Sequence, residues 1–168
     1  PVTSAVAKLQ DIGNRNLWLF FATGRYFYKN GSTVDEDYTN QQEAIYGIKD
    51  PCYIRDTANA NVNDLDPACT TTVTTALQDQ TSSITSIIPD TTPGWKINLA
   101  QATSTFKAQR VYTNPTATSG GAVFFTSFKP SSAVCSYGGS TSLWAVKYNT
   151  GGTVVGSNVR GQALLQLS

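Results

Sequence analysis

The sequence contains no histidine and no methionine among its 168 residues. Without histidine, Ser-His-Asp and Cys-His catalytic arrangements are excluded, as are histidine-ligated metal or haem sites built by this chain alone. Charge is also scarce: Asp, Glu, Lys and Arg make up 14% of the chain, and the formal net charge is +1. Because no long basic block is present, we expect no nucleic-acid partner. No apolar run approaches the roughly 20 residues of a membrane-spanning helix, so we expect no transmembrane segment.

Other catalytic signatures are missing as well. No Gly-Lys-Ser/Thr sequence follows the Gly-Gly pairs at residues 120–121 and 151–152, which fit hairpin turns better than phosphate-binding loops. Carboxylate pairs such as Asp35 with Asp37 could in principle act as acid and base in a glycosidase-like site. They do not lie beside clustered aromatics and strand ends that would build a sugar pocket. We therefore expect a protein without enzymatic activity.

Short apolar or alternating runs separated by turn residues predict an all-β fold. Residues 17–22, LWLFFA, are continuously apolar, which is typical of a strand buried on both faces. Residues 44–48 are predicted to be the antiparallel partner, and that strand must end at Asp50-Pro51 because proline cannot donate to a ladder. Further strands are predicted at residues 1–10, 94–99, 109–113, 122–128, 142–148 and 161–167.

Residues 51–93 are poorer in hydrophobic side chains than the rest of the chain. We expect them to form a polar insertion between core strands. The spacing of the apolar residues from Leu77 to Ile88 allows one short helix, although β-branching and the surrounding Thr and Ser oppose it.

Three cysteines make an odd count, which in an exported protein leaves one thiol free or paired outside the chain. Cys52 and Cys69 bracket a single polar loop, and a bond closing a loop of this size is worth about 3 kcal/mol in the chain-entropy model. We therefore predict a Cys52–Cys69 disulfide, with Cys135 as the remaining thiol. The alternative is three buried, unpaired cysteines.

The polar loop between the two cysteines holds asparagines at alternate positions: Asn59, Asn61 and Asn63. This is the spacing of an oxygen-ligand loop for Ca²⁺, but the leading carboxylates and the central glycine of such loops are missing. These asparagines are weak candidates for a metal site, and a solvated polar loop is the alternative.

A series of motifs recurs in order over most of residues 16–152: FATGRYF (21–27), QQ (41–42), IYGIKD (45–50), GWKINL (94–99), RVYTNP (110–115), VFFTSFKP (123–130), CSYGG (135–139) and LWAVKYNTG (143–151). The series resembles the C-terminal region of the PilY-type proteins. These are type IV pilus biogenesis and tip-adhesin factors whose C-terminal domain is a modified β-propeller.

The resemblance implies that residues 1–168 are a C-terminal fragment of one β-propeller domain, formed by its terminal blades. A closed ring needs at least four blades of about four strands, so an upstream segment of the same protein or a separate chain would complete it. The loop carrying Asp35, Glu36 and Asp37 would be an excursion from the blade rim, where we expect partner contact; solvated loop charges are the alternative. Family members carry a calcium loop on an earlier blade, so Ca²⁺ is a weak expectation here.

The resemblance also implies a cell-surface or extracellular, pilus-associated protein. It would act in pilus assembly, retraction control or adhesion through contacts with pilins or minor pilins. Two alternatives stay open: a lectin-like β domain that binds glycans, and a structural subunit of an extracellular filament. Sugar binding needs exposed Trp or Tyr side chains in loops, so a glycan array should be blank if Trp18, Trp95 and Trp144 are all buried.

Overall fold

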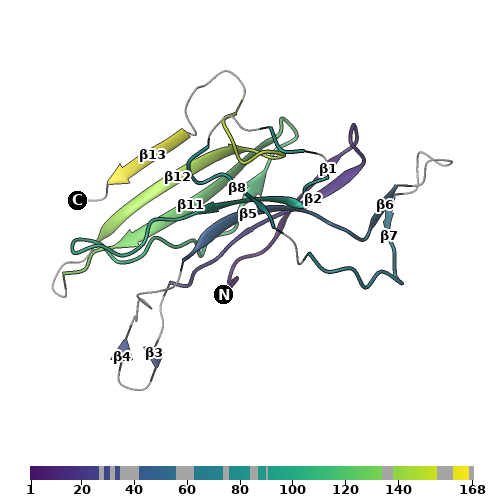
Figure 1. Ribbon diagram of the computed structural model, residues 1–168. Helices are drawn as coiled ribbons and strands as arrows, with labels where there is room; N and C mark the ends of the chain where they lie inside the picture. Colours follow the sequence, from purple (N-terminus) through teal and green to yellow (C-terminus); the bar gives the residue numbers. More distant parts are fainter. Residues whose placement is uncertain are drawn as a thin grey trace.

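The computed structural model describes residues 1–26, 29–30, 33–34, 42–55, 63–73, 76–83, 87–89, 91–133, 138–154 and 161–166. Within these ranges all regular structure is β, arranged in two main sheets and two short hairpins (Figure 1). The expected all-β class is therefore confirmed. Across the same ranges no helix is long and apolar enough to cross a bilayer.

The first sheet has five strands, in the spatial order β1 (Ala7–Asp11), β2 (Asn16–Ala22), β5 (Ala44–Lys49), β9 (Gly94–Asn98) and β8 (Gln78–Asp79). The first four form an antiparallel meander in chain order, and β8 adds to β9 in parallel. The predicted antiparallel pairing of the two strongest strands is confirmed, with Phe20 opposite Gly47.

The second sheet is antiparallel throughout, in the order β10 (Thr116–Ala117), β11 (Ala122–Pro130), β12 (Gly139–Lys147) and β13 (Gly161–Gln166). The hairpin between β10 and β11 turns at Gly121, whose φ of 81° lies in the region that favours glycine. Strand order again follows chain order, so each main sheet contains a four-stranded up-and-down meander.

The strand expected at residues 109–113 is not a regular strand. Arg110 forms an isolated antiparallel bridge with Phe128, and the ladder resumes where Thr116 pairs with Phe124. Six positions separate Arg110 from Thr116, whereas only four separate their partners Phe128 and Phe124. The extra residues cannot be paired, so this segment follows the edge of β11 with a broken ladder.

Residues 51–93 connect β5 to β9, which are neighbours in the sheet. The described part of this segment contains three short strands and no helix: β6 (Tyr53–Arg55), β7 (Asn63–Leu65) and β8. The helix expected between Leu77 and Ile88 is therefore wrong for the described residues. Gln78 and Asp79 instead pair with Trp95 and Lys96, because backbone hydrogen bonding to β9 outweighs the weak helix propensity of a Thr- and Ser-rich segment.

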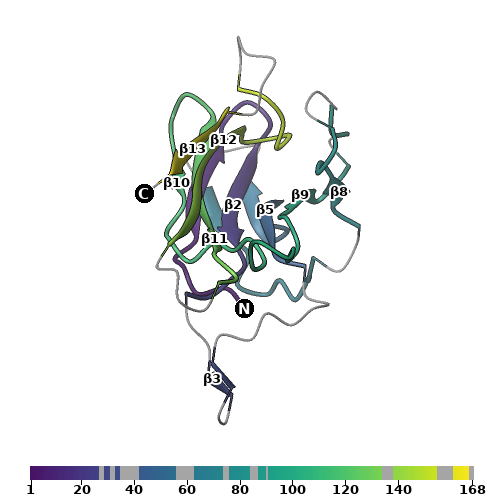
Figure 2. The same cartoon turned by 90° about the vertical axis from the view of Figure 1, so that its left-hand side faces the viewer.

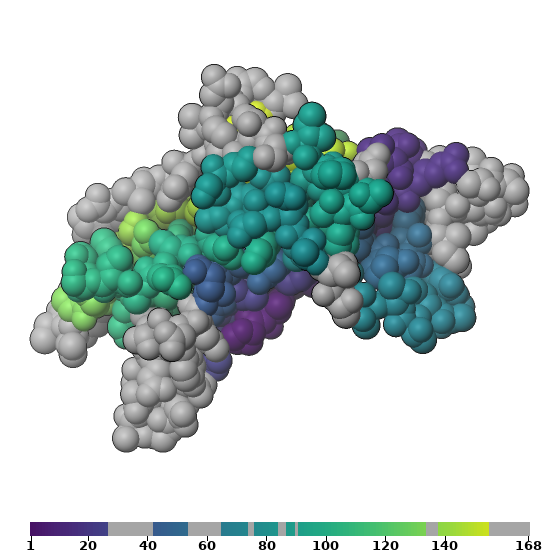
Figure 3. All heavy atoms as spheres, in the orientation of Figure 1, coloured from purple at the N-terminus to yellow at the C-terminus, as the bar shows by residue number. Residues whose placement is uncertain are grey.

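Two hairpins project from the main sheets (Figure 1). One pairs β6 with β7, and the other pairs β3 (Lys29–Asn30) with β4 (Thr33–Val34). In the space-filling view the teal segment that includes β8 and β9 covers the centre of the visible face, and the blue residues on either side of the β6–β7 hairpin lie toward one end (Figure 3).

The two main sheets lie side by side as layers (Figure 2). Their facing sides share one core of buried apolar side chains: Trp18, Phe20, Ala22, Ile45, Ile88, Trp95, Ile97, Leu99, Val111, Val123, Phe125 and Val146. Trp95 is fully buried and its Nε1 donates a 2.8 Å hydrogen bond to the carbonyl of Tyr148, just after β12. Its ring lies against the Cα of Gly47 on β5 and of Gly151 beyond β12, so this residue ties one layer to the other.

Candidate functional site

The first sheet is apolar on the face that points away from the second sheet. Side chains alternate along a strand, so the burial of Trp18 and Phe20 in the core leaves Leu17, Leu19 and Phe21 on the opposite face of β2. The register then places two residues of β5 on that face, since Ile48 lies opposite Leu19 and Tyr46 opposite Phe21. The outer apolar face consists of Leu17, Leu19, Phe21, Tyr46 and Ile48, all half-buried.

This outer apolar face is ordered and has a polar border. The rings of Phe21 and Tyr46 stack with centroids 5.1 Å apart and an interplanar angle of 17°. Lys8 is exposed on β1 directly opposite Leu19, and Lys96 on β9 lies opposite Tyr46. An apolar centre with a polar rim is the usual composition of a protein interface.

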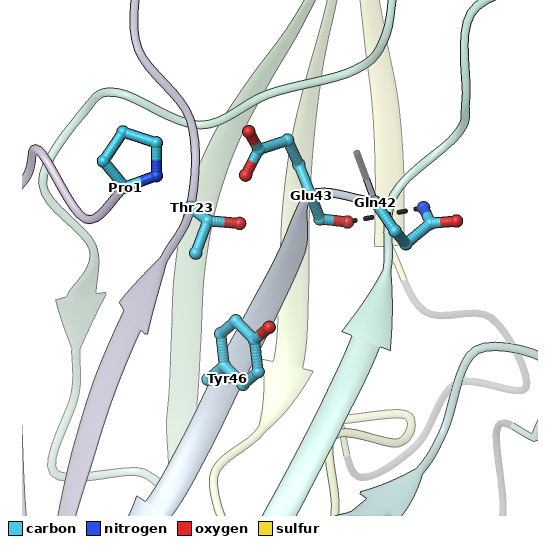
Figure 4. Close-up of a pocket in the computed structure, with 5 residues that line it drawn as sticks. All are labelled: Pro1, Thr23, Gln42, Glu43 and Tyr46. Carbon is cyan, nitrogen blue, oxygen red and sulfur yellow. Dashed lines mark hydrogen bonds between the residues drawn. The ribbon is translucent and has the colours of Figure 1, made fainter. Parts of the chain in front are cut away.

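A hollow of about 250 Å³ opens at one end of this face (Figure 4). It is lined by Pro1, Thr23, Gln42, Glu43 and Tyr46. The Oγ1 atom of Thr23 accepts a 2.9 Å hydrogen bond from the backbone N–H of Ala44, and Gln42 donates from Nε2 to the carbonyl of Leu99. Burial, and then the negative charge of Glu43, raise the pKa of Tyr46, so its hydroxyl stays protonated and available as a donor. The lining of the hollow is therefore polar, with the Thr23 hydroxyl and the Gln42 amide already bonded to the backbone.

The structure contains the predicted disulfide between Cys52 and Cys69, whose Cα atoms lie 5.5 Å apart. The bond closes the base of the β6–β7 hairpin. This hairpin is also tied to the first sheet, because Gln10 on β1 donates a 2.7 Å hydrogen bond to the hydroxyl of Tyr53. Cys135, the third cysteine, lies outside the described residues.

The other site residues expected from the sequence are largely beyond the described part of the chain. Asp35, Glu36 and Asp37 lie outside it, and so do Asn59 and Asn61. Asn63 begins β7, where its backbone is paired with Arg55. In the ranges that the structure describes, no group of three or more His, Cys, Asp or Glu residues could hold a metal ion.

A polar contact that the sequence did not reveal joins the two layers. The hydroxyl of Tyr148 donates a 2.7 Å hydrogen bond to Oδ2 of Asp11, which also accepts hydrogen bonds from the side chain and backbone of Asn14. Burial alone would raise the pKa of Asp11, but the hydrogen bonds from Asn14, Tyr148 and Gly13 outweigh it and lower that pKa. Burial, the hydrogen bond to Asp11 and the Asp11 charge together raise the pKa of Tyr148 to about 12.

We predict that Tyr148→Phe lowers the free energy of unfolding near neutral pH by about 1.5–3 kcal/mol, the usual range for a hydrogen bond to a charged group. A raised tyrosine pKa stabilises the fold fully below the unfolded value near 10, and this contribution is lost as the pH rises towards 12. The stability gap between wild type and Tyr148→Phe should therefore narrow over that interval, which urea unfolding at a series of pH values would measure. The difference in unfolding free energy should also become smaller at neutral pH in an Asp11→Asn background. A difference that stays the same at high pH and in the Asp11→Asn background would contradict the Tyr148–Asp11 contact.

A second feature missed by sequence reasoning is a ladder of three aromatic rings. Tyr26 is 68% exposed, and its ring meets that of Tyr112 edge-on with centroids 5.1 Å apart. Tyr112 in turn meets Phe128 on β11 edge-on at 6.4 Å. The three residues come from separate parts of the chain, so only the position of Tyr26 just after a buried strand and Gly24 could have indicated its exposure.

The tryptophan rings, unlike that of Tyr26, are not exposed to a ligand. Trp18 and Trp95 are buried in the core. Trp144 is half-buried, and its Nε1 donates a 2.8 Å hydrogen bond to the buried hydroxyl of Ser127. None of the three can present a free ring face to a ligand without disturbing the contact between the sheets.

In comparisons with known proteins, no family model, no curated protein and no solved structure matches the chain.

Proposed function

We propose that this chain is a non-enzymatic assembly module of a PilY-type protein. It is exported to the cell surface and acts in type IV pilus assembly, retraction control or adhesion through protein contacts. Its two main sheets are two successive blades of a β-propeller. The observation that carries the proposal is that each sheet contains a four-stranded antiparallel meander in chain order, β1-β2-β5-β9 followed by β10-β11-β12-β13. A propeller blade is a four-stranded sheet, and blades follow one another around the ring.

The position of the first strands supports the same arrangement. β1 begins the first meander and β10 begins the second, and these two strands contact one another. The chain just before β1 also meets the chain just before β10, where the backbone N–H of Ala5 donates a 2.9 Å hydrogen bond to Oδ1 of Asn114. Neighbouring first strands are expected when successive blades surround a common axis.

The outer apolar face is the surface at which we expect a partner to bind. A blade packs against a neighbour on each side, so it needs two apolar faces. The core side of the first sheet is covered by the second sheet, and its other side is the outer apolar face. We assign this face to a preceding blade, supplied by the upstream segment of the same protein or by a separate chain. Pilins or minor pilins are the further partners, met by the loop that holds Asp35, Glu36 and Asp37.

The Cys52–Cys69 disulfide is consistent with export, because such bonds form and persist in oxidising compartments. It supports the placement of this module outside the cytoplasm, where pilus-associated proteins function.

The test uses two substitutions at directly opposed positions of one face. Leu19→Asp puts a carboxylate in the middle of the outer apolar face, whereas Lys8→Asp puts one at its exposed border. Lys8→Asp should keep the urea midpoint of the isolated chain close to wild type, and Leu19→Asp, at a half-buried strand position, should lower the midpoint while leaving the chain folded. Leu19→Asp should weaken capture of the upstream segment of the same protein by roughly tenfold or more, because burying a carboxylate in an apolar contact costs desolvation free energy even beside the Lys8 ammonium.

In cells that make type IV pili, full-length protein carrying Leu19→Asp should lose surface pili, and Lys8→Asp should keep them. Normal piliation with Leu19→Asp would remove the outer apolar face from the proposal. A purified chain that is a monomer, unfolds cooperatively and hydrolyses a substrate on its own would overturn the proposed function altogether.

A further inference from the structure

The most exposed large aromatic side chain in the described structure is held in a fixed position. Tyr26 stands 68% exposed, yet its ring contacts Tyr112, which contacts Phe128. An exposed tyrosine in a loop would ordinarily be free to move. Here the aromatic ladder Tyr26–Tyr112–Phe128 runs from the surface to a strand of the second sheet, so Tyr26 is supported from beneath.

The backbone around the ladder is equally constrained. Gly24 has a φ of 141° and lies so close to residue 111 that a Cβ would come within 2.7 Å of the Val111 carbonyl oxygen. The backbone N–H of Val111 donates a 3.1 Å hydrogen bond to the carbonyl of Thr23. Arg110 and Phe128 exchange two backbone hydrogen bonds of 3.0 and 2.8 Å. The three segments of the chain that carry the rings are thus held together before any ligand binds, which lowers the entropic cost of binding.

Polar groups accompany the rings. Burial, and then Tyr26, raise the pKa of Tyr112, while the charge of Arg110 lowers it, and the net shift keeps the hydroxyl protonated. Arg110 is itself only 6% exposed. In the sequence Arg25 and Thr113 flank the two tyrosines. An exposed aromatic ring that carries its own hydroxyl suits a ligand with one apolar face and a rim of hydroxyls, and tyrosine supplies such contact area at little conformational cost.

We propose that the aromatic ladder Tyr26–Tyr112–Phe128 is a carbohydrate-binding platform, on which the C–H face of a pyranose ring stacks against Tyr26 while its hydroxyls bond to the phenol groups. The site is separate from the outer apolar face and does not depend on the proposed assembly function. It is open rather than enclosed, so a single sugar binds with a Kd of about 1 mM, and useful affinity comes from several sugars or several copies.

The experiment titrates the purified chain by NMR with the methyl pyranosides of glucose, galactose, mannose and N-acetylglucosamine. We expect at least one of them to bind and its C–H protons to shift upfield in the ring current of a tyrosine. Tyr26→Ala should raise the Kd about tenfold or more, the size of effect expected for a lost aromatic contact. Tyr26→Phe, which keeps the ring, should stay within about threefold of wild type.

Two controls separate this site from the rest of the surface. Ile87→Ala removes another highly exposed apolar side chain, 89% exposed, and should leave binding unchanged. Leu19→Asp, the variant that tests the proposed function, should also leave it unchanged. Absence of binding to all four glycosides, or binding that survives Tyr26→Ala, overturns the proposal. So does a result in which Tyr26→Ala abolishes capture of a pilin while no sugar binds, because the ladder would then be a protein contact.

Discussion

Trp95→Ala is expected to lower the free energy of unfolding by about 3–5 kcal/mol, the range for removing a large aromatic from a packed core. The side chain is fully buried and contacts Phe20 on β2, with ring centroids 6.3 Å apart. Its loss also leaves the carbonyl of Tyr148 without the hydrogen bond from Nε1. Because small domains are stable by only about 5–15 kcal/mol, this one change could unfold a large fraction of the protein. Urea unfolding followed by circular dichroism would measure it.

A second substitution shows whether the loss comes from the packing described. The ring of Trp95 lies over Gly47 so closely that a Cβ on Gly47 would overlap it. Gly47→Ala should therefore destabilise the wild type, by about 1–3 kcal/mol, as overpacking does. In the Trp95→Ala background the same methyl group enters an empty space, and alanine is better than glycine inside a strand. Gly47→Ala should then be neutral or stabilising, and equal effects in both backgrounds would contradict the contact.

Removing the disulfide by Cys52→Ser with Cys69→Ser should cost about 3 kcal/mol, given the 17-residue separation of the two cysteines and the chain-entropy model. The β6–β7 hairpin should be most affected, because the bond closes its base. Hydrogen exchange of the backbone amides in β6 and β7 would show the local loss, and urea unfolding would show the global one.

The matched control is chemical. Reducing agent should shift the urea midpoint of the wild type towards that of the double variant, and it should have no effect on the double variant. A response of the double variant to reducing agent would mean that Cys135 takes part in a bond that matters for stability.

The pairing of β2 with β5 could be predicted from the sequence because its signals are local. An unbroken apolar run at residues 17–22 and the Asp50-Pro51 stop are properties of short segments. The Cys52–Cys69 bond could be predicted for the same reason, because it closes a single loop. The sequence was misleading where a ladder depends on register. Residues 109–113 contain the strand-favouring Val, Tyr and Thr, but the two extra positions between Arg110 and Thr116 break the pairing.

The contacts that join the layers could not be predicted, because they link distant residues. Tyr148 and Asp11 are separated by 137 positions, and nothing near either one signals the other. The same holds for Tyr26 and Tyr112, whose contact depends on the close approach of Gly24 to Val111. The half-buried outer side of β2 was partly foreseen, since the continuous apolar run indicated burial on both faces. In the proposed propeller a neighbouring blade covers that side.

The short parallel strand β8 has a consequence for how this protein can associate. It occupies the free edge of β9, where the backbone N–H of Gln80 donates to the carbonyl of Lys96 and the hydroxyl oxygen of Thr81 accepts from the N–H of Asn98. Asp79 adds charge beside Lys96. A foreign strand therefore finds these backbone groups already bonded and cannot extend the sheet sideways there. In this way β8 protects the edge of β9 from pairing with another chain.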